Sequence, residues 1–152
     1  MTITAHTIHL TVRGADAASR WYAEAFDATE LTRIEVPGDR LIHVQLRIGD
    51  LRVTLADEFP ELESFGPQHL GGTYAAIYLQ VDDVDAAWAR VVGAGATVLR
   101  PLGDAFWGER EGQVLDPFGH RWGLSQHLQD VSLDELQARA TAAFSTPSPH
   151  GE

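Results

Sequence analysis

The chain has 152 residues, of which 11 are basic and 22 acidic, so its formal net charge is −11 and its isoelectric point lies near 4.9. This charge would repel a duplex or a polyphosphate, which excludes nucleic acid as a partner and favours a small organic ligand, preferably a cationic one. Every basic residue is arginine and cysteine is absent, which excludes lysine Schiff bases, disulfides and thiolate chemistry and fits a reducing cytoplasm. No apolar stretch is long enough to cross a bilayer, and the first residues do not resemble a signal peptide.

One pattern of residues occurs twice in the sequence, over residues 7–56 and 76–127. Val12 and Val81 are each followed four residues later by an aspartate and two alanines, and a glycine turn near the end of each unit also aligns. Such a period indicates a repeated supersecondary unit that cannot bury its apolar face alone. Two such halves can enclose a cavity, and the residues lining it decide the function.

In the first unit, apolar and polar side chains alternate over residues 7–12, which predicts a strand with Ile8 and Val12 on its apolar side. Apolar residues at helical spacing then run from Ala18 to Phe26 and predict an amphipathic helix that covers this side. Three more strands are predicted at residues 29–36, 41–48 and 51–56, the last two joined by a tight Gly-Asp turn.

The second unit repeats this order after an acidic connection, rich in proline and glycine, at residues 57–72. A helix is predicted from Val84 to Val92. The strands of this unit are predicted at residues 74–81, 96–100, 113–115 and 121–126. Ser132 and Glu135 form a capping box, which predicts a helix ending near Phe144.

The predicted fold class is therefore α+β, with two βαβββ modules that form curled antiparallel sheets around a cavity, followed by a C-terminal helix. We expect one domain over residues 5–130, made of modules at about 5–57 and 74–127. The C-terminal helix is expected at residues 131–145 and a frayed tail at 146–152.

The turn LDPFGHRW at residues 115–122, the paired units and the aspartate that opens each helix resemble the vicinal oxygen chelate superfamily, over roughly residues 5–130. The flanking segments resemble its glyoxalase-like or bleomycin-resistance-like subgroup. The superfamily includes glyoxalase I, extradiol dioxygenases, fosfomycin-resistance transferases and bleomycin-binding resistance proteins. The resemblance implies a dimer in which curled sheets form a ligand-binding cup.

The resemblance also implies a divalent metal held by His, Gln or Glu on the first and last strands of each unit. The matching positions are Thr7 and Ala76 on the first strands and Val53 and Gly123 on the last strands. A valine, an alanine and a glycine have no side-chain donor, and a threonine hydroxyl is a weak one. The sequence therefore predicts no metal at these positions and no cofactor.

A relocated metal site remains an alternative. His9 on the first strand and His43 on the third could face one cavity, with Gln45, Gln113 or Glu111 nearby. The other interpretation is that these histidines form hydrogen bonds to a ligand or to neighbouring side chains.

Several polar residues lie at alternating strand positions whose side chains are expected to point into the cavity. They are predicted to bind the ligand: Thr7, His9, Thr11, His43, Gln113, Arg121 and Ser125. Val53 and Leu55 are predicted to add an apolar wall. Tyr78 is expected either to stack on the ligand or to pack on the sheet, and Trp107, in a predicted loop at 104–112, to act as a lid. For Arg121, the alternatives are an anionic group of the ligand and an ion pair with Asp116.

Two classes of function remain open. The first is a metal-free protein that sequesters an antibiotic or a metabolite. The second is a lyase, isomerase or dioxygenase with a relocated metal or with His9 or His43 as a general base. We predict the first, in a cytoplasmic homodimer with a small organic ligand and with no membrane or nucleic-acid partner. The sequence leaves open whether the halves close one cup within a chain or across the dimer.

Overall fold

A computed structural model describes residues 1–145, and the predicted frayed tail at 146–152 lies outside this described part. The first module forms a mixed sheet with strand order β1-β4-β3-β2 and one long helix. Its elements are β1 (Ile8–Val12), α1 (Ala15–Phe26), β2 (Thr29–Val36), β3 (Arg40–Ile48) and β4 (Leu51–Asp57).

The second module repeats this arrangement with strand order β5-β8-β7-β6. Two short helices connect the modules, η1 (Pro60–Leu62) and α2 (Pro67–Leu70). The remaining elements are β5 (Ala76–Gln80), α3 (Val84–Gly93), β6 (Thr97–Asp104), β7 (Glu109–Leu115), β8 (Arg121–His127) and α4 (Leu133–Phe144). The predicted α+β fold of two βαβββ modules and a C-terminal helix is confirmed, but the sheets are mixed rather than antiparallel, because β1 pairs in parallel with β4 and β5 with β8. Within residues 1–145, no helix has the length and apolar content needed to span a membrane.

Each sheet is covered on one face by a long helix because its strands alternate apolar and polar side chains. In the first module, β1 runs parallel to β4, and the side chains of Val12, Val44 and Leu55 are fully buried on the covered face. In the second, Val114 and Trp122 lie opposite each other on β7 and β8 and are also fully buried. One apolar core runs through both modules. The opposite face of each sheet is left for polar side chains.

Asp57 caps the N-terminus of α1, because the N-cap residue, Gly14, has no side chain that could do so. One carboxylate oxygen of Asp57 accepts from the backbone N–H groups of Gly14 (3.1 Å) and Ala15 (2.7 Å), and the other accepts from that of Leu41 (2.7 Å). A negative charge is favourable at a helix N-terminus. The carboxylate at the end of β4 therefore fixes where the helix leaves the sheet.

The predicted cap of the C-terminal helix is present, since the Ser132 hydroxyl accepts from the Glu135 N–H at 3.3 Å. Asp83 caps α3 in the same way through the Ala86 N–H at 3.0 Å. These caps satisfy backbone donors that the helix itself leaves without partners.

A buried carboxylate, Asp116, joins the two modules. It accepts from the Tyr22 hydroxyl of α1 (2.6 Å), from the Trp122 indole (2.8 Å) and from the backbone N–H groups of Phe118 and His120 (2.9 Å each). Burial, followed by the charge of Asp116, raises the pKa of Tyr22 well above its usual range. Within residues 1–145 no ion pair joins Asp116 to Arg121, whose Nε has no hydrogen-bond partner, so the predicted ion pair between these two residues is wrong.

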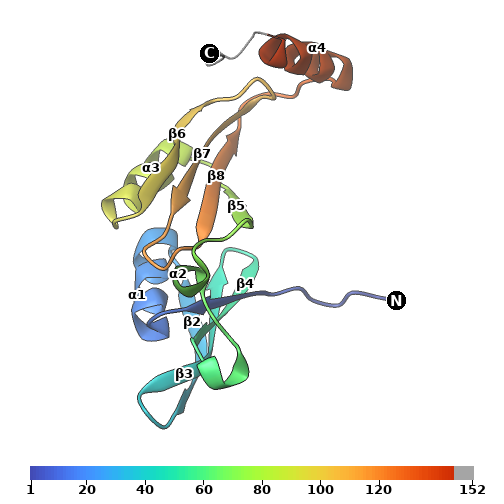
Figure 1. The fold of residues 1–152 in the computed structure, drawn as a ribbon. Coiled ribbons are helices and arrows are strands. Elements are labelled where there is room, and N and C mark those ends of the chain that lie inside the picture. The colour runs from blue at the N-terminus through green and yellow to red at the C-terminus, as the bar shows by residue number, and fades with distance from the viewer. Residues whose placement is uncertain (146–152) are drawn as a thin grey trace, which may run out of the picture.

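The two modules lie end to end, with α1 and α3 packed together and α4 beyond the second sheet (Figure 1). The Trp21 indole donates to the Ala94 carbonyl at 2.7 Å, and Arg90 donates to the Glu24 carbonyl at 2.5 Å. Each sheet ends on one side at the first strand of its module, which pairs with a single neighbour. Among residues 1–145, β1 and β5 therefore each have a free edge, that is, one with no paired strand, although His120 and Gly66 lie against the Thr11 carbonyl of β1.

The loop predicted at residues 104–112 is largely strand. β6 extends to Asp104 and β7 begins at Glu109, so only the segment between them turns. Glu109 and Glu111 are charged but alternate correctly in the sheet, opposite His127 and Ser125 of β8. The predicted loop is therefore wrong for residues 109–112. Charged side chains are compatible with a strand here because they lie on the polar face of the sheet.

Candidate functional site

The uncovered face of the first sheet, here called the first face, presents polar side chains in rows across the strands. Its central row is formed by His9 of β1, Thr54 of β4 and Gln45 of β3, which are direct neighbours in the register. His9 Nδ1 lies 2.8 Å from the Thr54 hydroxyl. By strand parity, the first face comprises His9, Thr11, His43, Gln45, Arg47, Arg52 and Thr54.

The apolar wall predicted from Val53 and Leu55 is wrong. Both side chains are fully buried in the core beneath α1, and Thr54 lies on the uncovered face in their place. The prediction failed because the spacing was counted from the turn, whereas a shift of one residue moves a strand side chain to the other face. Thr7 is exposed and precedes β1.

His9 lies close to two other histidines. Burial, followed by repulsion from His43 and His120, lowers the pKa of His9. His120 comes from the turn before β8, and its Nε2 lies 2.9 Å from the Thr11 carbonyl oxygen. The neutral form of His9 is therefore favoured, which leaves one of its ring nitrogens able to accept a hydrogen bond.

The uncovered face of the second sheet, the second face, is organised around Tyr78 of β5. Its hydroxyl oxygen accepts from the Gln113 side-chain amide and from Arg100 (3.2 Å), and Arg100 also pairs with Glu111 at 2.5 Å. The Tyr78 ring is half-exposed. The second face comprises Tyr78, Arg100, Glu109, Glu111, Gln113, Arg121, Gly123, Ser125 and His127.

Gly123 lies directly beneath the Tyr78 ring. The two residues are register neighbours, and a Cβ on Gly123 would overlap three atoms of the ring. The phenol can lie flat on the sheet only because position 123 has no side chain. At the last-strand position where the family resemblance implies a metal ligand, the second module therefore has a tyrosine ring lying on the backbone.

The residues present do not fit the metal implied by the family. Thr7 has only a weak donor, Ala76 and Gly123 have none, and Val53 is buried on the opposite face. Across residues 1–145, no group of three or more His, Cys, Asp or Glu side chains is placed to hold a metal ion.

Trp107 lies in the turn between β6 and β7, packed edge-on against Phe106 and about one-third exposed. It borders a hollow of about 190 Å³ that is also lined by Arg100 and Glu111. The C-terminal segment holds this turn, because Arg139 of α4 donates to the Phe106 carbonyl at 2.9 Å. Trp107 therefore lies at the rim of the second face, and its role as a lid stays a prediction.

His127, at the end of β8, lies between two carboxylates. Its Nδ1 is 2.9 Å from Glu109 and its Nε2 is 2.8 Å from Asp130. Only the doubly protonated ring can donate to both. The hydrogen bonds to Glu109 and then to Asp130 accordingly raise the pKa of His127. This contact ties the segment that leads into α4 to the sheet.

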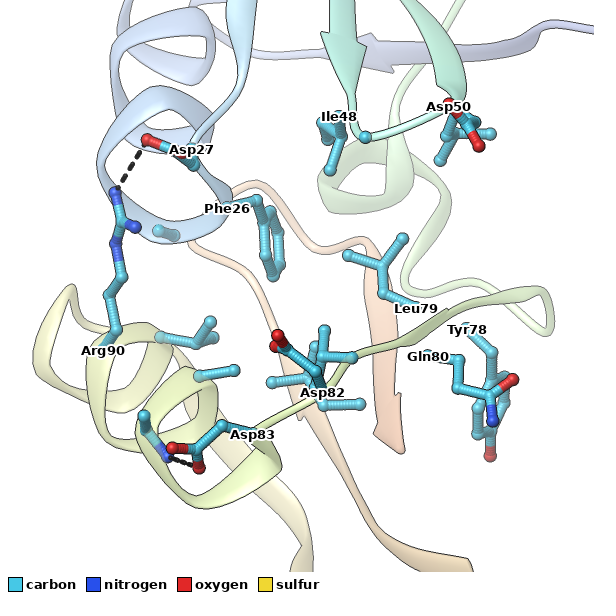
Figure 2. Close-up of a pocket in the computed structure, with 18 residues that line it drawn as sticks. Phe26, Asp27, Ile48, Asp50, Tyr78, Leu79, Gln80, Asp82, Asp83 and Arg90 are labelled. Atoms are coloured by element: carbon cyan, nitrogen blue, oxygen red, sulfur yellow. Dashed lines mark hydrogen bonds and ion pairs between the residues drawn. The ribbon is translucent and has the colours of Figure 1, made fainter. Parts of the chain in front are cut away.

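A cleft of about 900 Å³ lies between the modules, along the free edge of β5. Phe26 of α1, Ile48 of β3 and Leu79 of β5 line it, Asp50 lies at its margin, and the Asp82 carboxylate points toward Phe26 (Figure 2). Sequence reasoning did not find this cleft, because it depends on how the modules dock rather than on the pattern of either module.

The predicted ligand-binding residues fall into two groups. His9, Thr11 and His43 share the first face, and Tyr78, Gln113, Arg121 and Ser125 share the second, where Ser125 is buried. The two faces belong to separate sheets, and no strand of residues 1–145 joins one sheet to the other. Sequence reasoning missed Thr54, Arg47, Arg52 and Arg100, although the tight turn between β3 and β4 fixes the pairing of the first three.

A family model described as "Glyoxalase/Bleomycin resistance protein/Dioxygenase superfamily" matches residues 4–124. The chain therefore belongs to this superfamily, which confirms the resemblance seen in the sequence. Among curated proteins, an uncharacterized protein of Mycobacterium bovis is 47% identical over 133 residues, which cover 86% of this chain and 88% of the relative. An uncharacterized protein of Mycobacterium tuberculosis has the same identity over 86% of this chain and 78% of its own length.

Solved structures share the fold. TioX from Micromonospora sp. ML1 matches with a TM-score of 0.63 and 27% identity, covering 82% of this chain and 99% of TioX. The fosfomycin resistance protein FosX from Listeria monocytogenes matches with a TM-score of 0.64 and 19% identity, covering 89% of this chain and 98% of FosX. At that identity the likeness to FosX shows the fold alone.

Proposed function

We propose that this protein binds a small organic ligand against its first and second faces without a metal ion. The observation that carries the proposal is the Tyr78 ring lying on Gly123, at a position from which the family resemblance implies a metal ligand. An aromatic ring beside amide, hydroxyl and imidazole groups suits a ligand with aromatic and polar parts. Sequestration of an antibiotic or a metabolite is the role that this arrangement supports best.

The proposal includes a homodimer. The first and second faces lie on separate sheets, and β1 and β5 each have a free edge, so one chain alone does not enclose a ligand. A second copy could bring its β1 edge beside β5 and place its first face next to the second face of its partner. The apolar side chains in the cleft along β5, those of Phe26, Ile48 and Leu79, support such burial. The cytoplasmic location predicted from the composition is part of the same proposal.

Tyr78 is the residue that we expect to contact the ligand through a hydrogen bond. Its oxygen already accepts two N–H donors, from Gln113 and Arg100, so its own hydroxyl proton is left to donate outward. A carbonyl or other acceptor on a stacked ligand would satisfy it. Loss of a single such hydrogen bond typically costs about 1 kcal/mol, which is close to a tenfold change in affinity.

The test is to titrate the purified protein with bleomycin and with fosfomycin and to measure binding through the change in tryptophan fluorescence. For whichever compound binds, we expect Tyr78→Phe to weaken the affinity about tenfold. The matched control is Tyr74→Phe, which removes a hydroxyl from a fully exposed tyrosine and should leave the affinity within about twofold. Equal affinities for the two variants would count against the proposed site, and failure of both compounds to bind would count against antibiotic sequestration.

A metal-free enzyme is the second candidate, and one observation favours it. His9 has a lowered pKa and lies beside the Thr54 hydroxyl on the first face, so it is available as a neutral base. Turnover of a bound compound that is lost in His9→Gln, with the affinity retained, would distinguish this enzyme from a sequestering protein.

A further inference from the structure

Three of the arginines differ from the rest in having no acidic partner within residues 1–145. Eight of the 11 arginines form ion pairs with aspartate or glutamate: Arg13, Arg20, Arg33, Arg40, Arg90, Arg100, Arg110 and Arg139. Arg47, Arg52 and Arg121 form none. The chain has 22 acidic residues, so a shortage of carboxylates does not explain the exception.

Arg47 and Arg52 lie directly opposite each other in the β3–β4 hairpin. Both are exposed and both lie on the first face, next to the row that contains Gln45 and Thr54. Like charges at directly opposed positions of a sheet repel each other and destabilise the pair. The structure therefore keeps an unfavourable arrangement on the face that we propose for the ligand.

Arg121, the third arginine without an acidic partner in the described residues, lies on the other sheet and is not part of this pair. It opens β8 on the second face, opposite Ala76, and its Nε is buried without a hydrogen-bond partner. The carboxylate expected to pair with it, Asp116, is already used by Tyr22, Trp122 and backbone donors. Buried polar atoms without a partner are uncommon, and Glu109 Oε2 on the same face is a second one, so the second face carries unpaired groups of both signs.

We propose that Arg47 and Arg52 form a subsite for an anionic group of the ligand, namely a carboxylate, phosphate, phosphonate or sulfonate. Two adjacent guanidinium groups can offer several N–H donors to one tetrahedral or planar anion, and the anion removes their mutual repulsion. The inference rests on the proposed function, since it assigns the ligand class for the same face.

The net charge of the chain favours a cationic ligand, whereas this subsite would bind an anionic group. A net charge of −11 sets the long-range field, whereas the ligand contacts the local charges of the face. On the first face those local charges are positive. Asp50 lies in the turn of this hairpin, and in the described part of the chain it forms no ion pair with either arginine.

The test is a titration of the protein with inorganic phosphate, in which chloride is replaced so that the ionic strength stays constant. Calorimetry measures the binding, and thermal unfolding measures the stabilisation by bound phosphate. The variant is the double substitution Arg47→Gln and Arg52→Gln. The matched control is Arg13→Gln with Arg20→Gln, which changes the charge equally at two exposed arginines that pair with carboxylates. We expect the first variant to bind phosphate at least about tenfold more weakly than the wild type, and the control within about twofold.

Three results would overturn the inference. They are an absence of phosphate-specific binding to the wild type, full retention of that binding in the Arg47 and Arg52 variant, and dissociation of an oligomer by that variant. Dissociation of an oligomer would mean that Arg47 and Arg52 contact acidic residues of a second copy of the chain. Since phosphate binding does not require the organic ligand, a protein that binds an uncharged aromatic compound but ignores phosphate would refute this inference alone.

Discussion

Substitution Asp116→Ala is expected to lower the free energy of unfolding by about 3–5 kcal/mol. The carboxylate is buried and accepts four hydrogen bonds, so its removal leaves the Tyr22 hydroxyl, the Trp122 indole and two backbone N–H groups without partners. Each buried donor left in this way costs about 1–3 kcal/mol, and partial relaxation reduces the sum. Urea unfolding followed by circular dichroism measures the loss.

Tyr22→Phe is the control for this prediction, because it removes one of the four donors and leaves the carboxylate in place. We expect it to cost about 1 kcal/mol. If Asp116→Ala cost no more than Tyr22→Phe, Asp116 would not be the joint between the modules that its contacts indicate.

Substitution Gly123→Ala is expected to destabilise the protein by about 1–3 kcal/mol, because the added Cβ overlaps the Tyr78 ring and the backbone beneath it cannot move away easily. The ring must leave the sheet, and with it go the contacts to Gln113 and Arg100. Urea unfolding gives the stability, and the titration with bleomycin or fosfomycin reports the loss of the site.

The double variant Gly123→Ala with Tyr78→Ala isolates this overlap. Once the ring is absent, alanine at position 123 should cost little, so the two substitutions should be strongly non-additive. Gly93→Ala serves as the control, since no atom approaches a Cβ there and the residue lies in α3. Additive effects of the two substitutions would show that the ring does not rest on Gly123.

The strands and long helices were predictable because their side chains follow the two regular periods of secondary structure. The alternation through Leu10 and Val12 and the helical spacing through Tyr22 gave elements close to the observed β1 and α1. The Ser132 cap gave the start of α4 because capping is a local interaction.

The face of each side chain was harder to predict than the strand that carries it. The spacing of four residues after the turn glycine, implied by the family resemblance, predicts that Val53 faces the cavity. The register of the β3–β4 hairpin instead places it in the core. The pairing of Ile48 with Leu51 across the turn would have placed Val53 beside buried Leu46 and left Thr54 on the uncovered face. The register of the hairpin therefore assigns side chains to the two faces more reliably than the distance from the turn glycine does.

The contacts between modules were not predictable at all. Asp116 meets Tyr22 across 94 residues of sequence, and the cleft along β5 is lined by elements of both modules. No local period encodes such contacts, because they depend on how two finished modules dock. The Tyr78 ring on Gly123 is of the same kind, although the pairing of β5 with β8 would have suggested it.

The most direct test of the central claim measures the bound metal and the ligand affinity of the same untreated protein. Metal content is determined by mass spectrometry after exposure to manganese, nickel, zinc and iron(II), and the fluorescence titration is repeated in EDTA. Because Gly123 and Ala76 have no donors and Val53 faces the core, we expect far less than one bound ion per chain and an unchanged affinity in EDTA. One divalent ion per chain, with binding abolished by EDTA and restored by that metal, would contradict the account.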